Sequence, residues 1–399
     1  MNHWVYKAAV FAVALLLSGC SSWSNPFKEP VKGGSVEGIP AYVEPQTKAS
    51  TGLNRVWKTS VAGSPDKHQQ QPGQIVVAEN DLYIATFQGR LVRLNRETGR
   101  VVWEVTVAEH LSGGVALEGD RLFVGSLDGE MVALSRDTGK ELWRSELSAP
   151  VTSAPVAARG RVVFATLDSR TYALSSEDGR RLWVHSTPPE ILVVMGAATP
   201  TVDGSAVYVG YPSGDVFALA LESGSPMWSE NLSVTGGRSE LDLLQDVVAS
   251  VVVSREADSL LSGMKKIFAV NHQGRAVAML PNNGSRVWEH KLSAIRRPWL
   301  MGRQLLFSEM DGYVVALSAG EGLEAWRTRV SDGLLSAAVS MGSKVVVADN
   351  RGRLVTLDAG TGQVLGLDRL GDAVLADPVV VDNSLFLWTN EGNVFRYDF

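Results

Sequence analysis

The chain has 399 residues, of which 45% are hydrophobic and 39 are glycine, and its formal net charge at pH 7 is -6. This composition is typical of a mildly acidic, soluble globular protein, and it excludes a largely disordered chain and one with many membrane spans. The net negative charge argues against nucleic acid as a partner, and the single cysteine excludes a disulfide within the chain.

Residues 1–19 have the layout of a secretory signal peptide. A lone lysine, Lys7, precedes an apolar run over residues 8–17. This run is too short to cross a bilayer core of roughly 30 Å as a helix. We therefore predict that the segment is cleaved off.

The signal ends in Leu-Ser-Gly-Cys (residues 17–20), which contains the cysteine. This ending resembles the bacterial lipobox, and the resemblance implies that Cys20 is lipidated and becomes the first residue of the mature chain. Ser21 and Ser22 follow it, and neutral residues there imply transport to the outer membrane of a Gram-negative bacterium. The alternatives are an ordinary signal peptide with an incidental cysteine, or a free reactive thiol in a segment without a fold around it.

Residues 20–50 are predicted to be a flexible tether. Four prolines interrupt any helix or strand periodicity in this segment: Pro26, Pro30, Pro40 and Pro45. A flexible chain of this length reaches on the order of 30 Å, and proline stiffens and lengthens such a chain. The folded body can therefore stand off a membrane surface.

The rest of the chain is a repeat. Seven segments of equal length recur: Gly89–Trp103, Gly129–Trp143, Ser169–Trp183, Gly214–Trp228, Gly274–Trp288, Gly312–Trp326 and Gly352–Gly366. Each has a glycine four positions before its end: Gly99, Gly139, Gly179, Gly224, Gly284, Gly322 and Gly362. Such fixed spacing indicates that one strand, turn and strand recur with one turn geometry, in which glycine supplies a positive φ.

The repeat predicts an all-β fold. Short apolar strands alternate with turn residues, and a period near 40 with four strands per unit is typical of a propeller blade. The segment Glu391–Phe399 has a leading glycine and a strand but no following turn, whereas Thr51–Trp57 has the turn and tryptophan but no preceding strand. Joined, these two pieces complete an eighth blade and remove free sheet edges at the closure.

We therefore predict an eight-bladed β-propeller of four-stranded antiparallel blades over residues 51–399, closed by N- and C-terminal segments that share one blade. Seven blades is the alternative, if the terminal pieces do not pair.

Seven tryptophans occupy the last position of a repeat: Trp57, Trp103, Trp143, Trp183, Trp228, Trp288 and Trp326. We expect each indole to pack between neighbouring blades, and the alternative is a row of ligand-binding aromatic residues. Gly366 takes this position in the seventh unit, so the joint after that unit is predicted to be the weakest.

The blade motif, with its Ala-Leu, Thr-Gly and docking tryptophan, resembles the repeat of quinoprotein dehydrogenases. Together with the lipobox and eight blades in about 400 residues, it resembles the BamB family of lipoproteins of the outer-membrane β-barrel assembly machinery, the BAM complex. The resemblance implies a non-enzymatic scaffold, lipid-anchored in the outer membrane and facing the periplasm. It also implies that the chain, as a monomer, binds the periplasmic POTRA domains of BamA and assists the folding and insertion of β-barrel proteins. Direct binding of unfolded outer-membrane proteins is left open.

An enzyme is the main competing interpretation, as a relative of the PQQ-dependent dehydrogenases or a cofactor-binding propeller. A quinoprotein needs a vicinal cysteine pair, calcium ligands and long active-site insertions, and this chain has one cysteine. Its six histidines show no close pair at metal-ligand spacing; His185 and His290 lie two residues after repeat tryptophans and are expected to be strand-face residues. We predict no catalytic residue, metal or cofactor. A propeller that binds cell-wall or other envelope partners is a third interpretation.

Departures from the repeat length mark grafted loops. One connection gains five residues around Pro188–Gly196, and the next gains about 11 within Ser229–Val251. They are the same kind of connection in adjacent blades, so we expect them side by side on one face as one patch. A third insertion, of about nine residues within Ser254–Lys266, is given no role.

The patch is predicted to bind BamA through an apolar centre with acidic groups around it. Its residues are Leu192, Val194, Met195, Glu240, Asp242, Leu243, Leu244 and Asp246. The resemblance places Leu192, Val194 and Asp246 on the family's contact positions, whereas Met195 and Val248 replace a frequent arginine and aspartate. These departures leave apolar contact as the larger expected contribution. The alternative is that residues 191–195 are core strand and the acidic stretch is a solvated loop.

Overall fold

The computed structural model describes residues 42, 49–61, 74–188, 198–233, 247, 249–254, 264–272, 274–374 and 376–399. The predicted signal peptide, Cys20 and nearly all of the predicted tether lie outside these residues. Within the described part, all regular elements are β-strands, and no helix there is long and apolar enough to cross a membrane.

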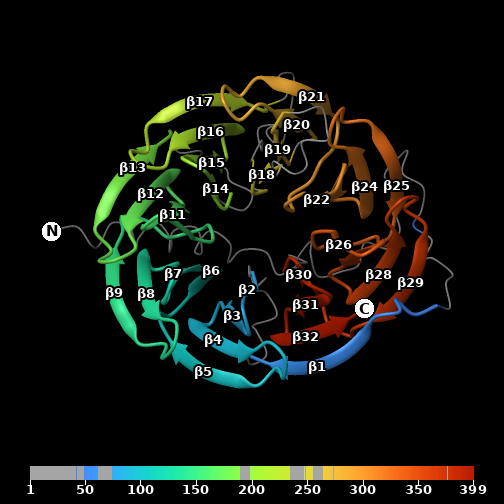
Figure 1. Cartoon of the computed structure of the whole chain (residues 1–399), viewed down its shortest axis with the longest axis horizontal. Coiled ribbons are helices and arrows are strands. Elements are labelled where there is room, and N and C mark those ends of the chain that lie inside the picture. Colours follow the sequence, from blue (N-terminus) through green and yellow to red (C-terminus); the bar gives the residue numbers. More distant parts are fainter. Residues whose placement is uncertain are drawn as a thin grey trace, which may run out of the picture. The chain divides into compact units, whose positions relative to one another are not determined.

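The strands form eight four-stranded antiparallel sheets, arranged as blades around a ring (Figure 1). Blades 1 to 4 are β2–β5 (Val76–Ala78, Asp81–Ala85, Arg90–Asn95, Val101–Thr106), β6–β9 (Leu111–Glu118, Arg121–Ser126, Glu130–Ser135, Glu141–Glu146), β10–β13 (Val156–Ala158, Arg161–Thr166, Arg170–Ser175, Arg181–Ser186) and β14–β17 (Thr201–Asp203, Ala206–Gly210, Asp215–Ala220, Pro226–Asn231). Blades 5 to 7 are β18–β21 (Val252–Val253, Ile267–Val270, Ala276–Met279, Arg286–His290), β22–β25 (Trp299–Met301, Gln304–Ser308, Tyr313–Ser318, Glu324–Arg329) and β26–β29 (Val339–Met341, Lys344–Ala348, Arg353–Asp358, Val364–Arg369). In each blade the first strand is innermost and the fourth outermost.

Blade 8 confirms the predicted closure by both termini. It contains β30 (Val379–Val381), β31 (Ser384–Trp388) and β32 (Asn393–Asp398), and its outermost strand is β1 (Asn54–Ser60) from the other end of the chain. The strand β1 pairs antiparallel with β32, from Asn54 opposite Asp398 to Ser60 opposite Asn393. The prediction of eight blades is therefore confirmed, and seven is excluded.

Burial follows the order of the strands within a blade. The second and third strands, such as β7 and β8, are almost wholly buried, because both of their faces pack on neighbouring blades. The outermost strand alternates, and in β9 only every second residue is half-buried. A register shift lies beside the repeat tryptophan position in every outermost strand, as between Ala133 and Leu134 opposite β9, and such bulges disrupt the exposed edge.

The repeat tryptophans join each blade to the next. In all seven cases the indole Nε1 donates a hydrogen bond to a backbone carbonyl of the following blade, at 2.8 to 3.2 Å. The ring lies against the turn glycine of that blade, where a Cβ would come within 2.5 to 3.1 Å of the indole. These glycines have φ between 68° and 73°. Glycine is therefore required at this position for two reasons: the backbone has a positive φ, and the indole ring approaches too closely for a Cβ.

The joint after blade 7 is built differently. A Cβ on Gly366 would overlap the carbonyl group of Ser50 and lie 2.8 Å from the Thr51 nitrogen, so backbone occupies the place of an indole. The Leu367 N–H donates to the Ala49 carbonyl at 3.0 Å, and Thr51 donates to the Asp368 carboxylate through both its N–H and its hydroxyl. The sequence predicts this joint to be the weakest because it lacks an indole, but the entering chain fills the space and adds hydrogen bonds.

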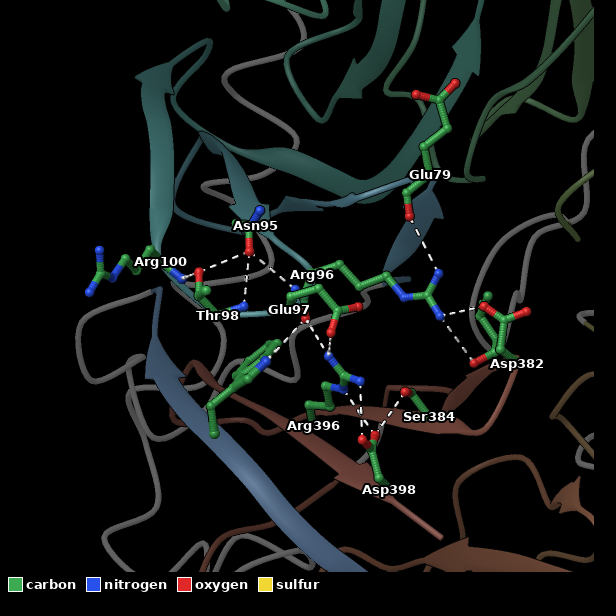
Figure 2. A network of polar contacts seen from close by, with 12 residues as sticks. Glu79, Asn95, Arg96, Glu97, Thr98, Arg100, Asp382, Ser384, Arg396 and Asp398 are labelled. Atoms are coloured by element: carbon green, nitrogen blue, oxygen red, sulfur yellow. Dashed lines mark hydrogen bonds and ion pairs between the residues drawn. The ribbon is translucent and has the colours of Figure 1, made fainter.

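A network of charged groups reinforces the joint between blades 8 and 1 (Figure 2). Arg396 of β32 is 8% exposed; its guanidinium reaches Glu97 in blade 1 at 2.5 Å and binds Asp398 through two nitrogens at 2.9 and 3.1 Å. Burial raises the pKa of Asp398, but hydrogen bonds from Arg396 and Ser384 outweigh it and leave that pKa below its usual value. In the other direction, Arg96 of blade 1 reaches Asp382 of blade 8 at 2.6 Å.

Replacing Gly366 with tryptophan, the residue found at the other seven joints, should destabilise the protein. The new side chain has to displace the backbone of Ser50 and Thr51, and overpacking of this kind costs about 1–3 kcal/mol. Thermal unfolding should show a melting temperature lower by a few degrees. In a chain that begins at Gly52 the same substitution should cost much less, and a higher melting temperature for Gly366→Trp in the intact chain would contradict this account.

Candidate functional site

Antiparallel strands divide the turns and connections between two faces of the ring. The connections from one blade to the next leave the outermost strands on the same face as the turns between second and third strands, and we call this the connection face. The hairpins between first and second strands and the turns between third and fourth strands lie on the opposite face. The two longer connections run from β13 to β14 and from β17 to β18, so their ends lie on the connection face.

The third insertion belongs to the hairpin between β18 and β19, which places its ends, Ser254 and Met264, on the opposite face. The chain also enters the ring on that face, because Thr51 and Gly52 complete the turn between the third and fourth strands of blade 8. The three insertions therefore do not form one surface at their bases.

The eight residues predicted to bind a partner lie outside the described residues. They are Leu192, Val194, Met195, Glu240, Asp242, Leu243, Leu244 and Asp246, and their arrangement stays a prediction. The structure does describe both ends of each connection.

The two connections end at the same point. The Ala198 N–H donates to the Gly210 carbonyl at 3.3 Å, and the Val247 N–H donates to the Tyr211 carbonyl at 3.2 Å. Gly210 is the last residue of β15, and a Cβ there would overlap the Val247 side chain, so glycine lets the second connection pack closely on the strand. Val247 is fully buried in a cluster with Leu232, the residue that follows β17. The ends of both connections are thus fixed to one strand end.

An aromatic cluster lies at the base of the two connections. His185 of β13 lies 5.0 Å from the ring of Phe217, and Tyr211 meets Phe217 edge to face at 5.5 Å. The Tyr211 ring is fully buried, and its hydroxyl is hydrogen-bonded to that of Thr171 at 2.6 Å. Burial raises the pKa of Tyr211, so the residue stays neutral.

The imidazole of His185 is part of this cluster. Its Nε2 is buried and has no hydrogen-bond partner among the described residues. Burial lowers the pKa of His185, since a charged ring between two aromatic side chains loses its hydration. The sequence predicts a strand-face residue here, but sequence spacing does not show that this face packs on Tyr211 and Phe217.

One group of three possible metal ligands occurs among the described residues. Atoms of Glu109, His110 and Asp128 lie within 4.8 Å of one another on the connection face, between blades 1 and 2. The spacing of histidines in the sequence does not predict this group, because its ligands come from two different loops. Exposed groupings of this kind are common without an ion, and we assign this one no role.

Comparison with known proteins identifies the family. A family model described as outer membrane protein assembly factor BamB matches residues 88–328 and 310–399. The chain belongs to the BamB family. BamB of Pseudomonas aeruginosa is 41% identical over 295 residues, which cover 74% of this chain and 72% of that protein.

Solved structures agree with the fold of the BamB family. BamB from Moraxella catarrhalis aligns with a TM-score of 0.75 at 21% identity, covering 87% of this chain and all of that one. A europium-containing methanol dehydrogenase aligns with a TM-score of 0.71 at 13% identity, covering 88% of this chain and 94% of that one. At such low identity both alignments show the fold alone. The quinoprotein dehydrogenases are therefore fold relatives of this BamB-family chain.

The neutral His185 predicts a pH dependence of stability. Its pKa is lower in the folded state than the value of about 6.5 in an unfolded chain. As the pH falls, the unfolded state therefore takes up the proton at a higher pH than the folded state. The contribution of His185 to stability is fully present above about pH 6.5. It is lost at up to about 1.4 kcal/mol per pH unit as the pH falls toward the pKa of the folded state.

Denaturant unfolding between about pH 7.5 and 5.5 should therefore show a shallower loss of stability in His185→Gln than in the parent chain. Val184→Gln changes an exposed neighbour in the same strand and should keep the parent slope. Equal slopes in His185→Gln and the parent would show that the imidazole is not the group responsible.

Proposed function

We propose that this chain is a non-enzymatic scaffold of outer-membrane protein assembly, and that the two long connections bind the periplasmic POTRA domains of BamA. Membership of the BamB family supports the general role, since its relatives are named as outer membrane protein assembly factors. The location of the site is inferred from one observation: both connections are hydrogen-bonded to adjacent residues at the end of β15, Gly210 and Tyr211.

Loops whose ends are already held in place favour binding, because affinity falls with each segment that binding has to order. In blades 4 and 5, the residues after the two connections return at once to hydrogen-bonded positions: Ala198 on Gly210, and Val247 on Tyr211. A patch built on these ends starts from one rigid strand end. Its sequence then supplies burial through Leu192, Val194, Leu243 and Leu244, and steering charge through Glu240, Asp242 and Asp246.

We also propose that Cys20 carries a lipid that anchors the chain to the outer membrane from the periplasmic side. The entering chain contacts blade 7 through Ala49 and Thr51, on the face opposite the connections. A tether that joins this face leaves the connection face open to a protein partner. Tethering and recognition then use different surfaces of one ring.

Catalysis is not part of this proposal. The dehydrogenase alignments are fold relationships at 13% identity, and a quinoprotein site needs a second cysteine beside the first, whereas this sequence has one, at Cys20. A protein-binding role needs only the surface that the connections provide.

The double substitution Leu192→Asp with Val194→Asp should remove binding to BamA. Two carboxylates in an apolar contact have to be desolvated without partners, so we expect at least about a tenfold loss in co-purification from detergent-solubilised envelopes. The matched control is Leu323→Asp with Leu365→Asp, which places the same charges on exposed residues outside the connection face. Undiminished association of the first variant, with an unchanged melting temperature in both, would place the BamA site elsewhere.

Cys20→Ala should release the protein from the membrane without affecting the ring. A single thiol is the attachment point for the lipid in this proposal, and the contacts of the entering chain with blade 7 at Ala49 and Thr51 are almost 30 residues further on. Fractionation should find the variant in the soluble fraction, with the melting temperature of the parent chain. Ser22→Ala, which keeps the cysteine, should stay in the outer membrane; a membrane-bound Cys20→Ala would show that lipid on this residue is not the anchor.

A further inference from the structure

A cavity of about 350 Å³ lies among the first strands of the blades. Its lining comes from blades 1 to 6, from Gln74 beside β2 to Arg297 beside β22. Because the first strands are the innermost of each blade (Figure 1), the cavity lies on the axis of the ring. Its volume falls in the range of small-ligand sites, about 300 to 1,000 Å³.

The strand register puts one residue of every blade at the same level of this axis. In seven blades this residue lies four positions before the last residue of the first strand. In blade 5 it lies four positions before Ser254, which is hydrogen-bonded to Lys266 opposite it. The eight are Gln74, Gly114, Ala154, Thr199, Ser250, Arg297, Ala337 and Asp377. We call them the axial ring. Since first strands begin at the connection face, the axial ring marks the mouth of the cavity on that face.

Arg297 is a positive charge without a partner in this ring. It forms no hydrogen bond or ion pair with the residues that the structure describes, and it is an exposed residue that lines the cavity, where the surrounding protein lowers its pKa. The opposing influence is Asp377, and that carboxylate already accepts a hydrogen bond from the Ala337 N–H at 3.2 Å. A guanidinium without a protein partner that is accessible from a cavity can bind an anion that accepts from its N–H groups.

The other polar groups of the cavity are neutral donors. Thr199, Thr201 and Ser250 bring hydroxyls and Gln74 brings an amide. The Thr201 hydroxyl donates to the Val251 carbonyl at 2.7 Å, whereas the structure records no side-chain hydrogen bond for the other three within the part that it describes. Valine, proline and alanine side chains make up most of the remaining wall. The site therefore has one cation and several neutral donors, and the carboxylate of the axial ring, Asp377, accepts a hydrogen bond from the Ala337 N–H.

We propose that the axial cavity binds a small anionic group, a carboxylate or a phosphate, with the Arg297 guanidinium as its principal ligand and Thr199, Ser250 and Gln74 as further donors. Both groups match the fork of N–H donors that arginine presents. The anion can be free in solution or can be the terminal carboxylate of a peptide chain. Thr199 directly follows the base of the first long connection, so an occupant lies beside the proposed protein-binding surface without depending on it.

Calorimetric titration of the intact lipoprotein in detergent separates these sources. The probes are inorganic phosphate, a tetrapeptide with a free α-carboxylate, and the same tetrapeptide with a C-terminal amide. Saturable binding of the acid peptide but not of phosphate identifies a chain end, and binding of both identifies a general anion site; either result supports the proposal. The amide peptide should not bind.

Arg297→Gln should weaken binding at least tenfold, and Arg297→Lys should retain part of it, because lysine keeps the charge but loses the bidentate geometry. Ser250→Ala gives a second test that leaves the charge in place, with a several-fold loss expected. Arg100→Gln is the matched control, since it removes one positive charge from the turn between β4 and β5, on the opposite face, and should bind as the parent does. Absence of binding by both anions, or unchanged binding in Arg297→Gln, would overturn the proposal.

Discussion

The contact of an indole with a glycine turn is the interaction on which the ring depends. Seven joints use it with the same hydrogen bond and the same positive φ. Each joint buries a large aromatic surface and gives the indole N–H a backbone carbonyl as hydrogen-bond acceptor. Truncating a buried aromatic side chain typically costs about 3–5 kcal/mol of stability. A closed ring needs every joint, because one open joint exposes the apolar faces of two blades.

Closure also explains the exception. A ring whose last blade takes its outermost strand from the other end of the chain has to admit that strand somewhere, and it does so where the eighth indole would lie. Gly366 leaves room for the backbone of Ser50 and Thr51. Other hydrogen bonds replace the one from an indole: the Leu367 N–H donates to the Ala49 carbonyl, and the Thr51 N–H donates to the Asp368 carboxylate. The irregularity in the repeat is thus a consequence of the ring topology. The charged network around Arg396 then holds the other side of the closing blade.

Regular spacing made the fold predictable from sequence. A glycine and a tryptophan at constant separation define both the turn and the joint, and the split terminal pieces define the closure. The reason for Gly366 was not predictable, since it depends on backbone arriving from residue 50. The axial ring has no motif at all, because its eight members are related only through strand register. The cluster of His185, Tyr211 and Phe217 likewise joins two blades, and the residues predicted to bind a partner lie outside the described part of the chain.

The same regularity limits where function can develop. A change in a strand or an indole joint disturbs two blades, whereas a change in a connection or at the axis leaves the joints intact. The chain departs from its repeat in these places: five and about 11 residues are added to adjacent connections, and one arginine, Arg297, lines the axial cavity. The two departures meet, because Ala198 is fixed to the end of β15 and Thr199 enters the axial ring in the next position. A protein that binds at the first connection would therefore lie one peptide unit from the wall of the axial cavity, because Ala198 ends that connection and Thr199 lines the cavity.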